Sequence, residues 1–537
     1  WPRTASENSA SSPKVDASAR AKSSMTTAAD LLLTNAEVHT LARPDETHGA
    51  VAVRDGRIVR VGDAYDLELL AGVDTRVVDC DGHVVLPGFI DAHTHFELLG
   101  RRLVHADLSG AESRAAALDR LRDRADAVDA GAPVVGYGYD ESEWGETDYL
   151  TRADLDGVDA AGPVVAVRED LHVASLDSTA LERWDDALPD AGVRREGGEP
   201  TGVVVETAAG VVLDALAPDA DGMAELLRAA QAHANERGVT GIHDMVRRSP
   251  APRVYRDLAS DGDLTLRVRL NYWADHLDAL VETGLRTNHG DGRVRVGAIK
   301  TFTDGSLGGR TARLSEPYAD APDERGEWAV PPTEFRDLFD SAAGAGFQVA
   351  AHAIGDEAVG EVVDAFASRA ESPDARHRIE HAELASDAAI DRMAAMGVVA
   401  SVQPNFHRWA GEEGLYAARL GDRRPETNRL RRLHEADVPL AFGSDGMPLD
   451  PLFGVHHAVN APTATQRLGV TEALRAYTLG SAYAGFDEDR LGTVEPGKRA
   501  DLVVLDGSPW ERPESIREVE VTLTVVGGDV VYDGSDP

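Results

Sequence analysis

The chain has 537 residues and a formal net charge of -39, from 93 Asp and Glu residues against 54 Lys and Arg residues. A surface of this sign repels nucleic acid and anionic membranes, so neither is an expected partner. No apolar run reaches the roughly 18 residues of a membrane-spanning helix, and the single cysteine, Cys80, excludes an internal disulfide. We therefore expect a soluble protein of a reducing compartment such as the cytoplasm, or of a lineage that avoids cysteine.

The basic residues are almost all arginine. Only four of them are lysines, Lys14, Lys22, Lys300 and Lys498. Carboxylates spread along the whole chain with so little lysine favour solubility in strong salt, where screening removes much of the self-repulsion. We interpret this composition as a sign of halophilic origin.

The two ends of the chain have a different sequence pattern from its middle. Residues 1–24 are rich in Ser and Ala and lack apolar periodicity, so we expect a disordered tail over residues 1–29, with Met25 as the native start. Short β-branched runs broken by Asp-Gly pairs follow from Leu31, and similar runs return after residue 500. These patterns predict one composite β-sandwich built from residues 30–85 and 486–537.

Residues 86–485 alternate between predicted strands and helices. An apolar run from Val84 to Ile90 predicts the first strand, and an irregular stretch of about residues 100–235 follows it as an insert. Seven further strands are predicted at residues 238–245, 266–273, 293–305, 346–356, 377–384, 397–406 and 439–448. Eight such units predict an α/β fold, a (β/α)8 TIM-like barrel, whose active site lies at the carboxyl ends of the strands.

Polar residues interrupt the apolar runs at several of these strand ends. His93 and His95 follow the first strand, and alternate residues of an extended chain point to one side, so the pair can chelate a metal. A chance pairing among 18 histidines is the alternative. Four other strands end in Lys300, His352, His381 and Asp445. Each of these histidines alone could be a core residue, but the set predicts metal binding.

Lys300 follows the apolar residues Ala298 and Ile299. Burial of its ammonium group there without a partner would cost free energy. One reading is a salt bridge to Asp304 or another carboxylate. The other is that its reactive amine has added carbon dioxide to form a carbamate, an anion that bridges two cations. Four histidines, a carbamate and a carboxylate suit two divalent ions, zinc first, then manganese, cobalt, nickel or iron.

Ordered motifs over residues 30–535 resemble the amidohydrolase superfamily, and within it the amidohydrolase family 3 group that includes N-substituted formamide deformylases. The motifs are PGFIDAHTH, GYGYDESEW, REDLHVASLDSTAL, KTFTDGSLGGRTA, AHAIGD, RIEHAEL, FGSDGMP and GTVEPGKRADLVVLD. The resemblance implies metal-ligand roles for His93, His95, Lys300, His352, His381 and Asp445. It also implies hydrolysis of an amide-like C–N bond of a small molecule, such as an N-formyl, N-acyl or cyclic amide.

We expect a metal-activated water to attack the substrate carbonyl. Asp445 would act as general base and then general acid, and His352 or His172 would help to polarise the carbonyl. Arg310, His172 and Trp144 are candidate substrate-binding residues, with the insert folded over the barrel mouth as a lid. For Arg310 a surface position in a flexible loop is equally consistent with the sequence, and Trp144 could instead pack the lid.

Two other functions remain open. A deaminase with a single metal would need no bridging lysine, and a noncatalytic relative would keep the barrel without its metals. The oligomeric state is also open, with a homodimer as one expectation.

Overall fold

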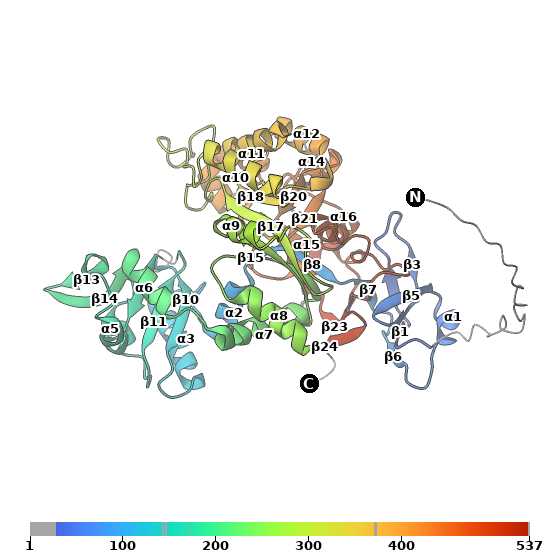
Figure 1. Ribbon diagram of the computed structural model, residues 1–537, viewed down its shortest axis with the longest axis horizontal. Helices are drawn as coiled ribbons and strands as arrows, with labels where there is room; N and C mark the ends of the chain where they lie inside the picture. The colour runs from blue at the N-terminus through green and yellow to red at the C-terminus, as the bar shows by residue number, and fades with distance from the viewer. Residues whose placement is uncertain (1–27, 142–143, 145–147, 171, 370–372, 535–537) are drawn as a thin grey trace, which may run out of the picture.

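The computed structural model describes residues 28–534, except 142–143, 145–147, 171 and 370–372. The predicted tail therefore lies outside the described residues, apart from Ala28 and Ala29. Figure 1 shows the barrel in the centre, with the insert on one side and the terminal sheets on the other. Within the described ranges, no helix combines the length and apolar character needed to cross a bilayer.

The central sheet has eight parallel strands that are neighbours in chain order. They are β8 (Phe89–Thr94), β15 (Val239–Val246), β16 (Arg267–Trp273), β17 (Val294–Phe302), β18 (Val349–Ala353), β19 (Arg378–His381), β20 (Val399–Val402) and β21 (Leu440–Phe442). The first and last strands meet where the backbone N–H of Asp445 donates to the carbonyl of His93 at 2.8 Å. A Cβ atom on Gly443 would lie 2.4 Å from the backbone nitrogen of His93, so glycine permits this approach. The (β/α)8 prediction is confirmed.

Helices cover the outside of the barrel. They are α7 (Ala220–Glu236), α8 (Ala251–Asp261), α9 (Leu277–Glu282), α10 (Pro332–Gly344), α11 (Asp356–Ser368), α12 (Asp387–Met396), α14 (Leu430–Glu435), α15 (Pro451–Val459), α16 (Val470–Arg475) and α17 (Ser481–Ala484). In α11, Val359, Val362, Val363 and Phe366 are buried at helical spacing. This apolar face packs into the main core, so burial rather than intrinsic propensity stabilises the helix.

The run predicted as one strand from Val84 to Ile90 is divided between two sheets. β7 (Val84–Pro87) pairs with strands from the two ends of the chain, and β8 begins at Phe89 in the barrel. A Cβ on Gly88 would come within 2.2 Å of the Thr240 side chain, so the crossing point must be glycine. Apolar periodicity reports burial and not the sheet to which a strand belongs, which explains this error.

Two sheets at the chain ends share one core. The six-stranded sheet combines β2 (Glu37–His39), β3 (Thr47–His48) and β7 with β22 (Leu502–Leu505), β23 (Val521–Val526) and β24 (Asp529–Asp533). The four-stranded sheet contains β1 (Leu31–Thr34), β4 (Ala50–Arg54), β5 (Arg57–Gly62) and β6 (Arg76–Asp79). Leu33 and Val53 of the second sheet pack in one cluster with Leu502 and Val525 of the first. The domain boundaries after residues 85 and 485 stay a prediction.

The insert is built on a sheet of its own, shown in teal in Figure 1. Its strands are β9 (Ala106–Asp107), β10 (Val134–Tyr139), β11 (Val164–Arg168), β12 (Val173–Leu176), β13 (Val193–Glu196) and β14 (Glu199–Val205). The helices are α3 (Arg114–Ala127), α4 (Arg152–Leu155), α5 (Ser178–Trp184) and α6 (Thr207–Ala215). α2 (Phe96–Val104) leads from the barrel into the insert and packs on α7. A Cβ on Gly100 would lie 2.4 Å from the Leu226 carbonyl oxygen, so the two helices touch backbone to backbone.

Candidate metal centre

Three predicted ligands meet where the first and last barrel strands join. The Nε2 atoms of His93 and His95 lie 3.6 and 3.3 Å from Oδ1 of Asp445. One ligand atom from each residue lies within 4.8 Å of the other two. Two imidazole nitrogens and one carboxylate oxygen are a ligand set that zinc and related divalent ions accept. The residues therefore fit a metal ion at this point.

Two further histidines lie beside this group. The ring centroid of His381 is 5.0 Å from that of His93 and 4.5 Å from that of His352. Nδ1 of His381 is buried without a hydrogen-bond partner in the described part of the chain. Buried polar atoms normally have a partner, so this imidazole nitrogen is available to bind a metal ion. His352 Nε2 contacts the carbonyl of Gly305 at 3.1 Å, which orients the ring and leaves Nδ1 for a ligand.

Lys300 lies near the carboxyl end of β17, two residues before Phe302, and is only 1% exposed. Among the described carboxylates, none forms a salt bridge with it, so the structure does not support the alternative of an ion pair with Asp304 or another carboxylate. Asp304 instead accepts backbone N–H groups from Arg313, Ile354 and Gly355 at 2.8 to 3.1 Å. Burial lowers the pKa of Lys300 to about 8, although nearby carboxylates oppose this shift.

Glu380 supports the first ligand and was not among the predicted site residues. Oε2 of Glu380 lies 2.6 Å from Nδ1 of His93, and Arg378 donates to both carboxylate oxygens at 2.7 and 3.0 Å. Burial opposes ionisation of this carboxylate, but Arg378 and His93 hold its pKa well below the usual range. The sequence signal for Glu380 was the presence of Arg378 and Glu380 in the short buried strand β19, because buried charges need partners.

Asp445 remains a carboxylate in spite of its burial. Hydrogen bonding to His95 and the charges of the neighbouring histidines lower its pKa against the effect of desolvation. The backbone of Asp445 has φ = 58° and that of His381 has φ = 70°. Such left-handed conformations are uncommon outside glycine and persist where the surrounding structure enforces them, often at functional sites.

Asp91 connects the strand of His93 to the turn of Asp445. It was also not among the predicted site residues. Its carboxylate accepts the backbone N–H of His93 at 3.0 Å and that of Ser444 at 3.1 Å. The strand that carries His93 is thereby joined to the turn that carries Asp445. The carboxylate is fully buried, and desolvation raises its pKa to about 7.

A pocket of about 340 Å³ opens beside His95. The insert contributes Tyr137 and Leu213 to its wall, while Arg247 and Trp273 come from the barrel. The Arg247 guanidinium stands 4.8 Å from the centre of the Trp273 ring. The insert therefore forms part of the pocket next to the metal centre.

The structure does not bring the predicted substrate-binding residues to this pocket. Trp144 is buried in the core of the insert, where its Nε1 donates to the carbonyl of Ala111 at 2.7 Å. Arg310 forms an ion pair with Asp320 at 2.8 Å in the same long loop. Both side chains already have local partners, which explains why they do not reach the site.

His172 lies at an exposed position of the insert. Its Nδ1 is 3.1 Å from Oε2 of Glu206, and both side chains are largely solvent-exposed. The residue is absent from the pocket wall. The motif that contains it resembles the family pattern, and within the described residues its side chain pairs with Glu206 of the insert.

Comparisons with known proteins identify the family of the chain. The sequence profile of the amidohydrolase family matches residues 76–532. The chain is 31% identical to the putative amidohydrolase YtcJ of Bacillus subtilis, over 93% of this chain and 98% of that protein. It is 27% identical to an N-substituted formamide deformylase of Arthrobacter pascens, over 95% of this chain and 99% of that protein.

The fold has a close counterpart among solved structures. An uncharacterized metal-dependent hydrolase from Pyrococcus furiosus superposes with a TM-score of 0.76 at 30% identity, covering 89% of this chain and 99% of that one. The family match covers the insert, the barrel with its metal centre and, from the terminal sheets, the strands that lie after residue 75. The chain therefore belongs to the amidohydrolase family.

Proposed function

We propose that the protein is a metal-dependent hydrolase that cleaves the C–N bond of a small amide, with an N-formyl, N-acyl or cyclic amide as the substrate class. The convergence of His93, His95 and Asp445 at the barrel mouth carries this proposal. The family relationship and the similarity to an N-substituted formamide deformylase support the choice of bond.

We assign six metal ligands: His93, His95, Lys300, His352, His381 and Asp445. For Lys300, addition of carbon dioxide would form an N–C bond and release one proton, turning the amine into an anionic carbamate. Its burial without a carboxylate partner supports this assignment. Two divalent ions, zinc first, would lower the pKa of a water molecule toward neutrality and polarise a carbonyl group.

The protein's own groups position the substrate and move the proton. Asp445 accepts the proton of the attacking water and passes it to the leaving amine. His352, oriented by the Gly305 carbonyl, would help to polarise the carbonyl group of the substrate through the metal ion that it holds. The pocket beside His95 receives the organic part of the substrate, and Tyr137 shields it from solvent on the insert side.

The test combines metal analysis with a substrate screen. The purified protein is expected to hold two zinc ions per chain and to release amine from members of an N-formyl, N-acyl and cyclic amide panel. A chelator should abolish turnover, and added zinc should restore it. His95→Asn should lose metal and activity, whereas His48→Asn in a terminal sheet should keep both. Protein without bound metal and without turnover on the panel would contradict the proposal and favour a noncatalytic role.

A deaminase remains the second candidate, because the tight group of His93, His95 and Asp445 alone is sufficient for one ion. One metal per chain together with ammonia release from ring amino groups would identify it. Two metals with amine release from acyclic amides would exclude it.

A further inference from the structure

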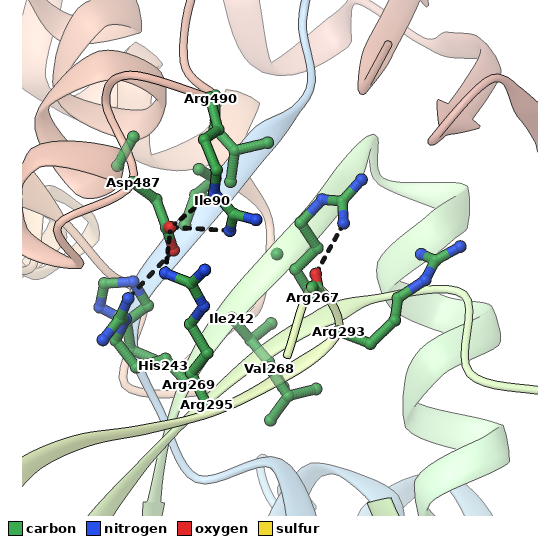
Figure 2. A pocket seen from close by; sticks show the side chains of 14 residues that line it. Ile90, Ile242, His243, Arg267, Val268, Arg269, Arg293, Arg295, Asp487 and Arg490 are labelled. Atoms are coloured by element: carbon green, nitrogen blue, oxygen red, sulfur yellow. Dashed lines mark hydrogen bonds and ion pairs between the residues drawn. The ribbon is translucent and has the colours of Figure 1, made fainter. Parts of the chain in front are cut away.

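An arginine-rich pocket, shown in Figure 2, lies at the amino ends of barrel strands, whereas the metal centre lies toward the carboxyl ends. It is formed near the amino ends of β15, β16 and β17 and by the segment around residues 482–491. Its described lining includes five arginines and one carboxylate: Arg267, Arg269, Arg293, Arg295, Arg490 and Asp487. In a chain with a net charge of -39, this is a local excess of positive charge.

The carboxylate of Asp487 pairs with three of these guanidinium groups. Asp487 is 3.0 Å from nitrogens of Arg269 and Arg295 and 2.7 Å from a nitrogen of Arg490. Figure 2 shows the three contacts converging on this side chain. Two positive charges of this group are therefore left without a carboxylate in the pocket.

The other two arginines do not remove the excess. Arg267 has its own partner, Asp501, at 2.8 Å. Nη1 of Arg293 is buried and has no hydrogen-bond acceptor in the described part of the structure. Burial lowers the pKa of Arg293, and the neighbouring Arg267 lowers it further.

Two further donors point to one place at the edge of this pocket. Nδ1 of His243 contacts Nη1 of Arg378 at 2.9 Å, and because arginine only donates, the proton of His243 must be on Nε2. This Nε2 and Nε of Arg269 each lie 2.9 Å from the point that a Cβ on Gly485 would occupy. Nε of Arg269 is buried without an acceptor among the described residues, and the side chains of His243 and Arg269 are at most 4% exposed. Unsatisfied buried donors are costly, so an acceptor is expected there.

The size of the pocket limits what this acceptor can be. The space open to the centre of a water-sized sphere is about 20 Å³, which is enough for one small species and favours a monatomic ion over a larger anion. Water would satisfy the donors but would leave the positive charge uncompensated. We propose that the pocket binds a single monatomic anion, chloride, which compensates one of the two remaining positive charges and links the segment around residues 482–491 to the base of the barrel.

The first test measures thermal unfolding while chloride replaces gluconate at constant ionic strength. The midpoint of the wild-type protein should rise with chloride and saturate, because the anion binds only the folded state. Arg490→Gln removes one guanidinium and should raise the apparent dissociation constant for chloride at least about tenfold. Arg228→Gln, which breaks an exposed pair with Asp263, removes the same charge and should keep the wild-type response.

A second variant should change the affinity in the opposite direction. Asp487→Asn removes the carboxylate that competes for the arginines, so chloride should bind more tightly and compensate part of the lost stability. If this variant does not fold, the comparison of Arg490→Gln with Arg228→Gln still decides the question. An identical chloride response in those two variants would overturn the proposal, because it would show only a general salt effect.

Bromide provides a direct readout. Crystals of the wild-type protein grown with bromide should show an anomalous peak between Arg269, Arg490 and His243, and crystals of Arg490→Gln should not. An ordered water without anomalous signal at this position in the wild-type protein would also overturn the proposal.

Discussion

Nδ1 of His93 lies 2.6 Å from Oε2 of Glu380, and both side chains are at most 1% exposed. Arg378 holds Glu380 from the other side, so the carboxylate has a fixed position. Because Nδ1 is engaged, Nε2 of His93 is the nitrogen that faces Asp445. A buried carboxylate that orients a histidine in this way raises the basicity of the ligand.

Glu380→Gln should therefore weaken metal binding about 10–100-fold, because the amide orients His93 without adding negative charge. Competition with a chromophoric chelator measures this affinity. Glu225→Gln on the exposed side of α7 is the matched control and should bind metal like the wild type. An unchanged affinity in Glu380→Gln would show that this carboxylate does not support the metal site.

Asp445→Asn should reduce turnover by about 10²–10⁴-fold while the histidines keep the metal bound, because an amide cannot accept the proton of water. Steady-state rates and metal content are measured on the same samples. Asp437→Asn is a close control, since Asp437 is exposed and has a similar backbone, with φ = 61° against 58° at Asp445. Turnover that survives in Asp445→Asn would remove the residue from its assigned role.

Asp244 should make stability depend on pH. Its buried carboxyl accepts the N–H of Phe96 and the hydroxyl of Tyr255, both at 2.9 Å. Burial raises its pKa from 3.8 to about 6, so between these values the folded state keeps a proton that the unfolded state has released. Stability from this group is therefore present at low pH and is lost as the pH rises toward about 6.

Asp244→Asn stays neutral at every pH and should remove this loss. Relative to the wild type, its free energy of unfolding should improve by up to about 3 kcal/mol as the pH rises from about 4 to 6. Urea unfolding of both proteins across this range measures the difference. A difference that is constant with pH would contradict the assignment.

Cys80 should resist thiol reagents in the folded protein. The side chain is 4% exposed, and burial together with the charge of Asp79 raises its pKa to about 11. At pH 8 only about one thousandth of the thiol would be ionised, and the thiolate is the reactive form. A disulfide reagent should label one thiol per chain in denaturant and react slowly without it. Rapid labelling of the native protein would show that the sandwich core opens readily.

Low salt should destabilise the whole protein if its composition reflects a halophilic origin. Mutual repulsion among the 93 acidic side chains is screened in strong salt and unscreened in dilute buffer. The unfolding midpoint should be clearly higher in molar KCl than in low KCl, for the wild type and for Arg490→Gln alike. Coinciding midpoints would refute the halophilic interpretation.

The sequence by itself determined the barrel and most of the candidate metal centre. Alternation of strands and helices is a local property, and so is the position of His93, Lys300 or Asp445 at a strand end. In a (β/α)8 barrel the parallel strands bring their carboxyl ends to one face, so side chains at these ends are expected to converge.

Only the tertiary structure decided which side chains touch. Glu380 contacts His93 across 287 positions of the chain, and Arg269 contacts Asp487 across 218. No periodicity encodes such pairs, because they depend on how distant strands and loops meet. For the same reason the sequence left open whether Trp144 binds substrate or packs the insert, and the structure places its indole in the core of the insert. The periodicity of a strand depends on residues that are neighbours in the sequence. Contacts inside a closed barrel join residues far apart in the sequence and form only when the whole chain is folded.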